Sequence, residues 1–202
     1  MKSIPAREEV LRMSGRKGLI TPGDLVARGI HTQALARLVG EGKLERVGRG
    51  IYRAATPQVT EHHGLVLASV AVPAGVVCLL SALSFHSVGT QVPQEVWIAV
   101  DRRAARPGGD AVPLRVVRFS GAALTQGIET HGLEGRPVRV YNLAKTLADC
   151  FKYRNKIGTD VAVEALRESL VERKVSPAEI DRYSRICRVE RVMRPYLEAL
   201  AG

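Results

Sequence analysis

A chain of 202 residues, 46% of them hydrophobic, is long enough for one large domain or two smaller ones, each with its own core. Its ordinary glycine and proline content excludes a disordered chain, and its longest apolar stretch, residues 65–83, is too interrupted at Pro73 for a membrane span. Three distant cysteines without a C-x-x-C pair are typical of free thiols in a reducing cytoplasm, where we expect this protein to act.

The charge of the chain is strongly basic and unevenly spread. The formal net charge is +10, which makes a polyanion the expected partner, although charge of this kind can also serve solubility alone. Residues 1–56 contain 11 Lys and Arg against 5 Asp and Glu, residues 57–140 contain 7 against 6, and residues 141–202 contain 12 against 9. Most of the excess therefore lies in the first block.

The first block reads as three short helices. Residues 6–13 form a helix candidate that ends in the segment 14–18. A second helix is expected to start at Thr21, a good N-cap, with Pro22 at the first helical position and Asp24 as the return carboxylate of a capping box. Gly29 supplies the residue that ends it, and a third helix is expected from His31 or Thr32 onward.

The third helix has the pattern of a DNA-recognition helix. Its apolar residues fall on one face, which leaves Thr32, Gln33 and Arg37 on the other. The first turns of a recognition helix meet base edges in the major groove, where Gln33 could read adenine and Arg37 could read guanine or a phosphate. The alternative is the solvated face of an ordinary amphipathic helix.

A short hairpin follows, with an arginine at its tip. Residues 44–47 alternate as in a strand, Gly48, Arg49 and Gly50 form the turn, and residues 51–53 form the return strand. Helices followed by such a hairpin predict a winged helix-turn-helix that binds double-stranded DNA, over residues 1–56. The residues expected to contact DNA are Arg16, Lys17, Thr32, Gln33, Arg37, Lys43, Arg46 and Arg49. A winged helix can also dock proteins, which is the main competing hypothesis.

After a linker at residues 55–58, the pattern predicts a second domain, an α+β body over residues 57–202. We expect helices over 60–72 and 81–85, strands over 94–100, 114–119 and 137–140, and helices from residue 143 onward. In the strand 94–100, alternate residues are expected to face the core. Ser176, Pro177 and Glu179 predict a capping box with proline at the first helical position.

Little in the second domain points to catalysis. His62 and His63 lack the spacing of a metal site, and Asp101 lacks the E-x-K partner of a nuclease on the next strand. We therefore expect no enzyme activity, no catalytic residue, no metal and no cofactor; a nucleic-acid-processing enzyme is the disfavoured alternative.

Three groups of polar residues remain open between a structural and a functional role. Lys145, Thr146 and Asp149 are either a helix cap with a surface ion pair or a contact point for a partner. A basic loop and a carboxy-terminal arginine stripe are either solvated or part of a nucleic-acid surface. The loop holds Arg102, Arg103 and Arg106, and the stripe holds Arg182, Arg185, Arg188, Arg191 and Arg194.

Four segments in order resemble AbiEi-type antitoxins, the regulatory partners of type IV toxin–antitoxin systems. They are residues 29–52, the "LLSAL" segment 79–84, the strand 95–100 and the segment 138–150, where Lys145 stands in place of a common arginine. The resemblance implies a bacterial autorepressor that binds its own promoter, at inverted repeats, and carries a second, antitoxin domain. It also implies a nucleotidyltransferase-like toxin that is countered without a stable complex; the alternative is an antitoxin that binds an acidic toxin directly.

Overall fold

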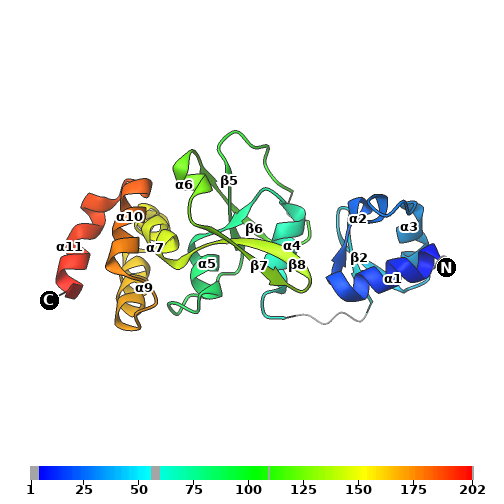
Figure 1. Ribbon diagram of the computed structural model, residues 1–202, viewed down its shortest axis with the longest axis horizontal. Coiled ribbons are helices and arrows are strands. Elements are labelled where there is room, and N and C mark those ends of the chain that lie inside the picture. Colours follow the sequence, from blue (N-terminus) through cyan, green and yellow to red (C-terminus); the bar gives the residue numbers. More distant parts are fainter. Residues whose placement is uncertain (1–4, 56–59, 109, 202) are drawn as a thin grey trace. The chain divides into compact units, whose positions relative to one another are not determined.

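The computed structural model describes residues 5–55, 60–108 and 110–201, and side chains to residue 200. Its described residues fall into two compact units (Figure 1). The first comprises Met1–Pro73, Pro107–Pro113 and His131–Val138, and the second comprises Ala74–Arg106, Leu114–Thr130 and Arg139–Gly202. Of the predicted linker, Ala55 forms a bend and residues 56–59 lie outside the described part, so the boundary at residue 56 stays a prediction.

The first unit begins with a helix-turn-helix and a hairpin, as the sequence predicts. Its elements are α1 (Ala6–Lys17), β1 (Leu19–Ile20), α2 (Pro22–Val26), α3 (Gln33–Gly40), β2 (Leu44–Gly48), β3 (Ile51–Ala54) and α4 (His63–Ala71). The strands form an antiparallel sheet in the order β1-β3-β2. Val10, Leu25, Leu35 and Leu38 are among the residues of the shared core, so α1, α2 and α3 all pack on one cluster.

Local backbone chemistry sets the helix ends in this unit. Thr21 and Asp24 form both halves of the predicted capping box at α2. Gly29 is left-handed, with φ +68°, in the turn before α3. Helix α1 extends one turn beyond the predicted end, because Ser14 is buried in the helix and donates to the Leu11 carbonyl instead of breaking it.

The second unit is built on a mixed sheet of five strands, in the order β6-β5-β4-β8-β7. The strands are β4 (Val76–Val77), β5 (Val96–Asp101), β6 (Leu114–Phe119), β7 (Ile128–Leu133) and β8 (Arg136–Tyr141), and the outer part of the β7–β8 hairpin belongs to the first unit. β5 runs parallel to β6 and antiparallel to β4. The predicted one-sided alternation in β5 is wrong: residues 96–100 are all buried, because the strand lies between β6 and β4 and is covered on both faces.

The second unit also contains helices, most of which lie in the carboxy-terminal part of the chain (Figure 1). They are α5 (Leu79–Phe85), α6 (Ala122–Thr125), α7 (Leu143–Lys152), α8 (Arg154–Ile157), α9 (Thr159–Val171), α10 (Pro177–Cys187) and α11 (Glu190–Ala201). The predicted Ser176–Glu179 capping box is present at α10. Helix α7 is the central element, since residues 143–151 are all buried and α5, α9, α10 and α11 pack against it.

A buried ion pair lies inside α7. Lys145 Nζ is 2.5 Å from Asp149 Oδ2, and the two side chains are 0% and 1% exposed. The i, i+4 spacing is as predicted. The predicted position of the pair on the helix surface is wrong, because both side chains are buried in the core. Lys145 Nζ also lies 4.2 Å from the centroid of the Tyr141 ring, and the Cys187 thiol donates to Asp149 Oδ1 at 3.2 Å.

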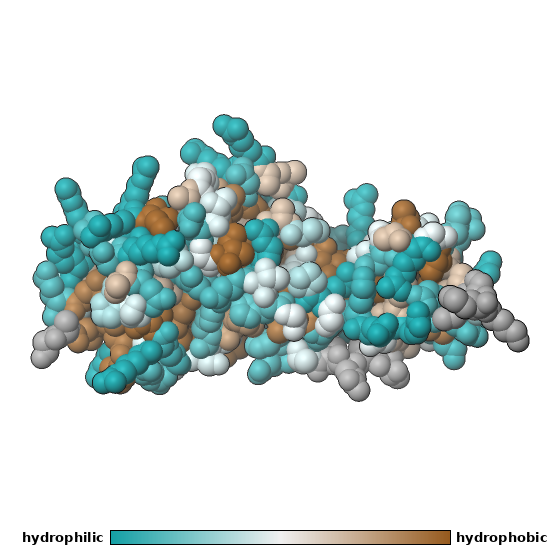
Figure 2. Space-filling model, in the orientation of Figure 1, coloured by the Kyte–Doolittle hydropathy of each residue, from teal (hydrophilic) through white to brown (hydrophobic). Residues whose placement is uncertain are grey.

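The side chains of the second unit separate by polarity. Hydrophilic residues cover much of the visible face of the carboxy-terminal helices, and hydrophobic residues show between them (Figure 2).

Within the described ranges, no helix has both the length and the apolar content needed to cross a membrane.

We predict that Lys145→Met destabilises the second unit by about 3–5 kcal/mol, because it leaves the Asp149 carboxylate buried without its cation. Removing both charges, as Lys145→Met with Asp149→Leu, should restore most of that stability. Urea unfolding followed by circular dichroism measures both. A double variant as unstable as the single one would show that the pair itself, and not the isolated charge, stabilises the core.

Candidate nucleic-acid interface

Helix α3 presents a polar face to solvent. Leu35 and Leu38 are buried in the core, whereas Gln33, Ala36, Arg37 and Gly40 are exposed. The helix starts where predicted: Thr32 is its N-cap and is exposed, and the His31 ring nitrogen Nδ1 accepts from the Gln33 backbone N–H. Thr32, Gln33 and Arg37 therefore stand together at the amino-terminal half of an exposed helix face.

The hairpin formed by β2 and β3 carries Arg49 at its tip. Arg49 is exposed, and Gly50 beside it is left-handed with φ +70°. Arg46 Nε donates to the Gly48 carbonyl at 3.2 Å, where the strand register shifts, so this side chain braces the turn. A Cβ at Gly48 would lie 2.7 Å from the Ala111 Cβ, so the wing needs glycine here for a close approach to the loop at residues 107–113.

Some cations of this unit are neutralised by carboxylates and some are not. Arg7 pairs with Glu41, Arg28 with Glu9, and Arg53 with Glu45. By contrast, the predicted contact residues Arg16, Arg37, Lys43 and Arg49 are all exposed, and no carboxylate partner is present for them in the described part of the chain. Their charge is therefore available to an external anion.

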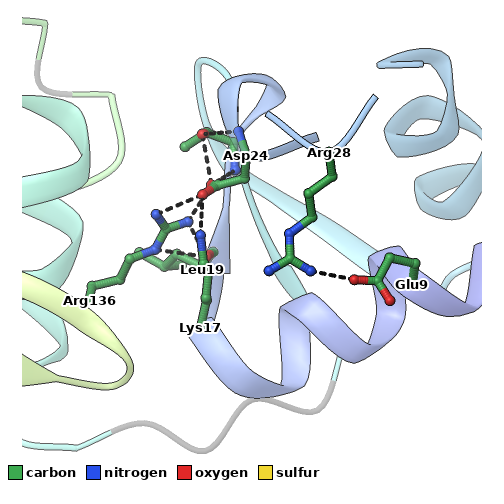
Figure 3. Close-up of polar contacts among 7 residues, drawn as sticks. Glu9, Lys17, Leu19, Asp24, Arg28 and Arg136 are labelled. Atoms are coloured by element: carbon green, nitrogen blue, oxygen red, sulfur yellow. Dashed lines mark hydrogen bonds and ion pairs between the residues drawn. The ribbon is translucent and has the colours of Figure 1, made fainter. Parts of the chain in front are cut away.

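Lys17 differs from the other predicted contacts. Its Nζ lies 2.6 Å from Asp24 Oδ1, and its side chain is half-buried at the end of α1 (Figure 3). Lys17 is thus engaged in holding α1 to α2, whereas its neighbour Arg16 points its charge to solvent.

Asp24 is the centre of a polar cluster, of which the sequence reveals only the capping box with Thr21. Its Oδ2 accepts from the Thr21 backbone N–H at 2.8 Å and from the Thr21 hydroxyl at 2.9 Å. Arg136, at the start of β8, reaches the same carboxylate at 2.5 Å and also donates to the Leu19 carbonyl (Figure 3). Arg136 is 112 residues from Asp24, and no spacing or motif in the sequence reveals the contact.

The turn that carries Arg136 is fitted closely to the first helix. Gly135 has φ +72°, and a Cβ there would lie 2.3 Å from the Arg16 carbonyl oxygen. On the other side of the turn, the Glu134 carboxylate accepts from the Thr60 backbone N–H at 2.8 Å and lies 2.7 Å from His63 Nδ1. His63, the first residue of α4, thus has a structural role at the start of this helix.

Burial alone would raise the pKa of Asp24, but hydrogen bonds from Arg136, Lys17 and Thr21 outweigh that effect and hold its pKa well below the usual range. The carboxylate is therefore ionised at neutral pH.

The remaining candidate residues lie in the second unit, where some are buried and others are exposed. Thr146 is buried and its hydroxyl donates to the Tyr141 carbonyl, so neither it nor the Lys145–Asp149 pair is exposed to a partner. Arg102, Arg103 and Arg106 are exposed in a loop, and Asp101 Oδ1 accepts from the Arg103 backbone N–H. No group of three or more potential ligand residues is positioned to hold a metal in the described ranges.

The predicted arginine stripe is exposed but not continuous. Helix α10 ends at Cys187, Arg188 is left-handed with φ +59°, and α11 starts anew at Glu190. A single stripe at three-residue spacing is therefore wrong, because the helix axis changes at Arg188. Arg185 and Arg194 pair with acidic residues of their own helices.

A helix-turn-helix followed by a two-stranded wing with an arginine at its tip defines the first part of the chain as a winged-helix domain. Residues 9–55 match the family model described as "Transcriptional regulator, AbiEi antitoxin". This match covers the winged helix and agrees with the resemblance seen in residues 29–52.

Most of the chain has a related fold in a solved structure. The crystal structure of the RV2827C protein from Mycobacterium tuberculosis superposes with a TM-score of 0.59, covering 91% of this chain and 72% of that chain, at 17% sequence identity. At that identity the likeness concerns the fold alone. No curated protein matches the chain.

We predict that Asp24→Asn destabilises the first unit by about 2–4 kcal/mol, because it removes the charge that Arg136 and Lys17 share. Since the folded-state pKa is depressed, this stabilisation is fully present above the unfolded-state pKa of about 3.9 and is lost as the pH falls below it. Urea unfolding at neutral and acidic pH measures the effect.

The matched control for this experiment is Glu45→Gln, which removes an exposed carboxylate paired with Arg53 in the same unit. We expect it to cost at most about 1 kcal/mol. Equal losses for the two variants, or a difference that does not shrink in acid, would contradict the role given to Asp24.

Proposed function

We propose that this protein is a DNA-binding transcriptional repressor of its own promoter and the antitoxin of a type IV toxin–antitoxin system. The observation that carries the proposal is the set of uncompensated cations on α3 and the wing, in a segment that matches AbiEi transcriptional regulators. Phosphate contacts of this kind supply affinity, and base-edge contacts supply specificity.

In the proposed complex, α3 enters the major groove of double-stranded DNA. Thr32, Gln33 and Arg37 meet base edges, because they lie on the exposed face at the start of the helix. Lys43 and Arg49 hold the phosphate backbone or the minor groove beside it, and Arg46 contributes from the base of the wing while it braces the turn. Arg16 adds a phosphate contact; Lys17 contributes less, because Asp24 already neutralises it.

Repression follows from occupancy of the promoter, and we expect the operator to contain inverted repeats that two copies read together. The second unit supplies the antitoxin function, which counters a nucleotidyltransferase-like toxin in the cytoplasm without forming a stable complex. Helix α7 contributes rigidity to that unit, since its polar residues are buried. We infer that the protein acts by binding and has no enzyme activity.

Replacing Arg49 tests the wing. Arg49→Ala should lower the affinity for all DNA sequences similarly and reduce the slope of log affinity against log salt by ~1, because one phosphate contact is lost. Fluorescence anisotropy over a salt series measures both. Arg12→Ala is the control, since it removes an exposed cation of α1 that pairs with Glu9; an equal effect of both variants would indicate unspecific charge attraction.

Replacing Gln33 tests base reading. Gln33→Ala should cost about 1–3 kcal/mol on the preferred operator and relax the preference at a single base-pair position, with the salt slope unchanged. Binding to a library of single-base operator variants measures the change. A uniform loss over all positions would assign Gln33 to the backbone and not to a base.

The alternative is that the protein binds an acidic toxin directly and uses the winged helix for docking. The same basic surface supports it, since an acidic protein can replace a phosphate backbone. Co-expression with the product of the adjacent gene followed by affinity purification separates the two: a stable 1:1 complex without promoter binding would replace the repressor proposal.

A further inference from the structure

The second unit contains a cavity that the DNA-binding function does not use. It has a volume of about 340 Å³, which is within the range of small-molecule sites. Three cations from different elements line it: Arg118 on β6, Lys152 at the end of α7, and Arg188 between α10 and α11. None of the described residues that line it is acidic, so the wall of the cavity is positively charged.

Two of these cations are fixed by main-chain carbonyls. Arg118 Nη1 donates to the carbonyl oxygens of Asp101, Arg102 and Ala104, at 3.2, 3.2 and 2.7 Å. Lys152 Nζ donates to the Cys187 carbonyl at 3.1 Å. Carbonyl partners orient a cation without cancelling its charge, and each group keeps further N–H donors for a ligand.

The third cation is placed by the backbone. Arg188 is left-handed with φ +59°, while its neighbours Cys187 and Val189 are buried in the core. A non-glycine residue in this conformation is costly and persists only where the surroundings hold it. Arg188 lines the cavity from the junction between α10 and α11, where its two buried neighbours hold the backbone in place.

The rest of the wall is suited to the organic part of a ligand. Tyr153 and Ile186 are partly exposed and supply aromatic and aliphatic surface, and the Ser120 hydroxyl adds a neutral donor. Three separate cations suit the tetrahedral dianion of a phosphate monoester better than a planar carboxylate, because they approach from different elements.

We propose that this cavity binds a small phosphate monoester of about the size of a mononucleotide, with the phosphate held by Arg118, Lys152 and Arg188. The site would make the second unit responsive to a small molecule and is independent of DNA binding by α3 and the wing.

The test uses the full-length chain and isothermal titration calorimetry with three probes at constant ionic strength: adenosine monophosphate, inorganic phosphate and adenosine. We expect the monophosphate to bind, inorganic phosphate to bind more weakly, and adenosine not to bind at millimolar concentration. If inorganic phosphate binds as tightly as the monophosphate, the organic part of the proposal is wrong and the site is for the free ion.

Arg188→Gln should weaken binding of the monophosphate roughly tenfold, because a charge-assisted hydrogen bond is lost. Lys152→Gln provides a second variant in case the first alters the helix junction, and an unchanged unfolding temperature without ligand shows that each is folded. Arg191→Gln is the matched control, since it removes an exposed arginine of α11 that does not line the cavity.

Three results would overturn the proposal: no binding by any probe, an equal loss in Arg191→Gln, or equal competition by an oligonucleotide without a terminal phosphate. The last would assign the cavity to a nucleic-acid backbone. Promoter binding by Arg188→Gln should equal that of the wild type, so failure of this site and failure of the repressor function are distinguished.

Discussion

The winged-helix part of this protein depends on one carboxylate. Asp24 completes the capping box of α2. Its carboxylate also pairs with Lys17 at the end of α1 and with Arg136 from the β7–β8 turn. The carboxylate therefore joins three segments that are separate in the sequence. Since α2 and α3 share a core with α1, the position of the exposed face of α3 follows from this arrangement. A charge that lies outside the exposed face of α3 thus helps to position that face.

Charge is used in two distinct ways in this chain. Cations that maintain the fold are matched with carboxylates, as in the Arg28–Glu9 pair on the surface and the Lys145–Asp149 pair in the core. Cations available to partners have no such match, as with Arg37 and Arg49 in the described part of the first unit. Net charge alone does not separate the two groups; the pairing of individual side chains does.

The winged helix can be predicted from the sequence because each of the signals that define it lies within a short segment. The Thr21–Asp24 cap, the glycines of the turn and wing, and the apolar spacing of Leu35 and Leu38 each act within a few residues. The same holds for the Ser176 cap and for strand β6, whose predicted bounds agree with the structure. Such features depend on the backbone chemistry of a short segment.

Features that depend on tertiary packing cannot be predicted from local sequence. The burial of Lys145 depends on residues distant in the sequence, such as Phe119, and an i, i+4 pair has the same spacing whether it faces solvent or core. The reach of Arg136 to Asp24 spans 112 positions. The sequence does not reveal strand β7, because its segment, IETHGL, lacks an apolar alternation.

The burial of Cys78, Cys150 and Cys187 has a consequence for redox chemistry. All three thiols are free and shielded from solvent, and burial raises the pKa of each, to about 12 for Cys187. Oxidants and disulfides react with the thiolate form, which is then scarce at neutral pH. The three cysteines are thus poorly placed for a thiol-based redox response.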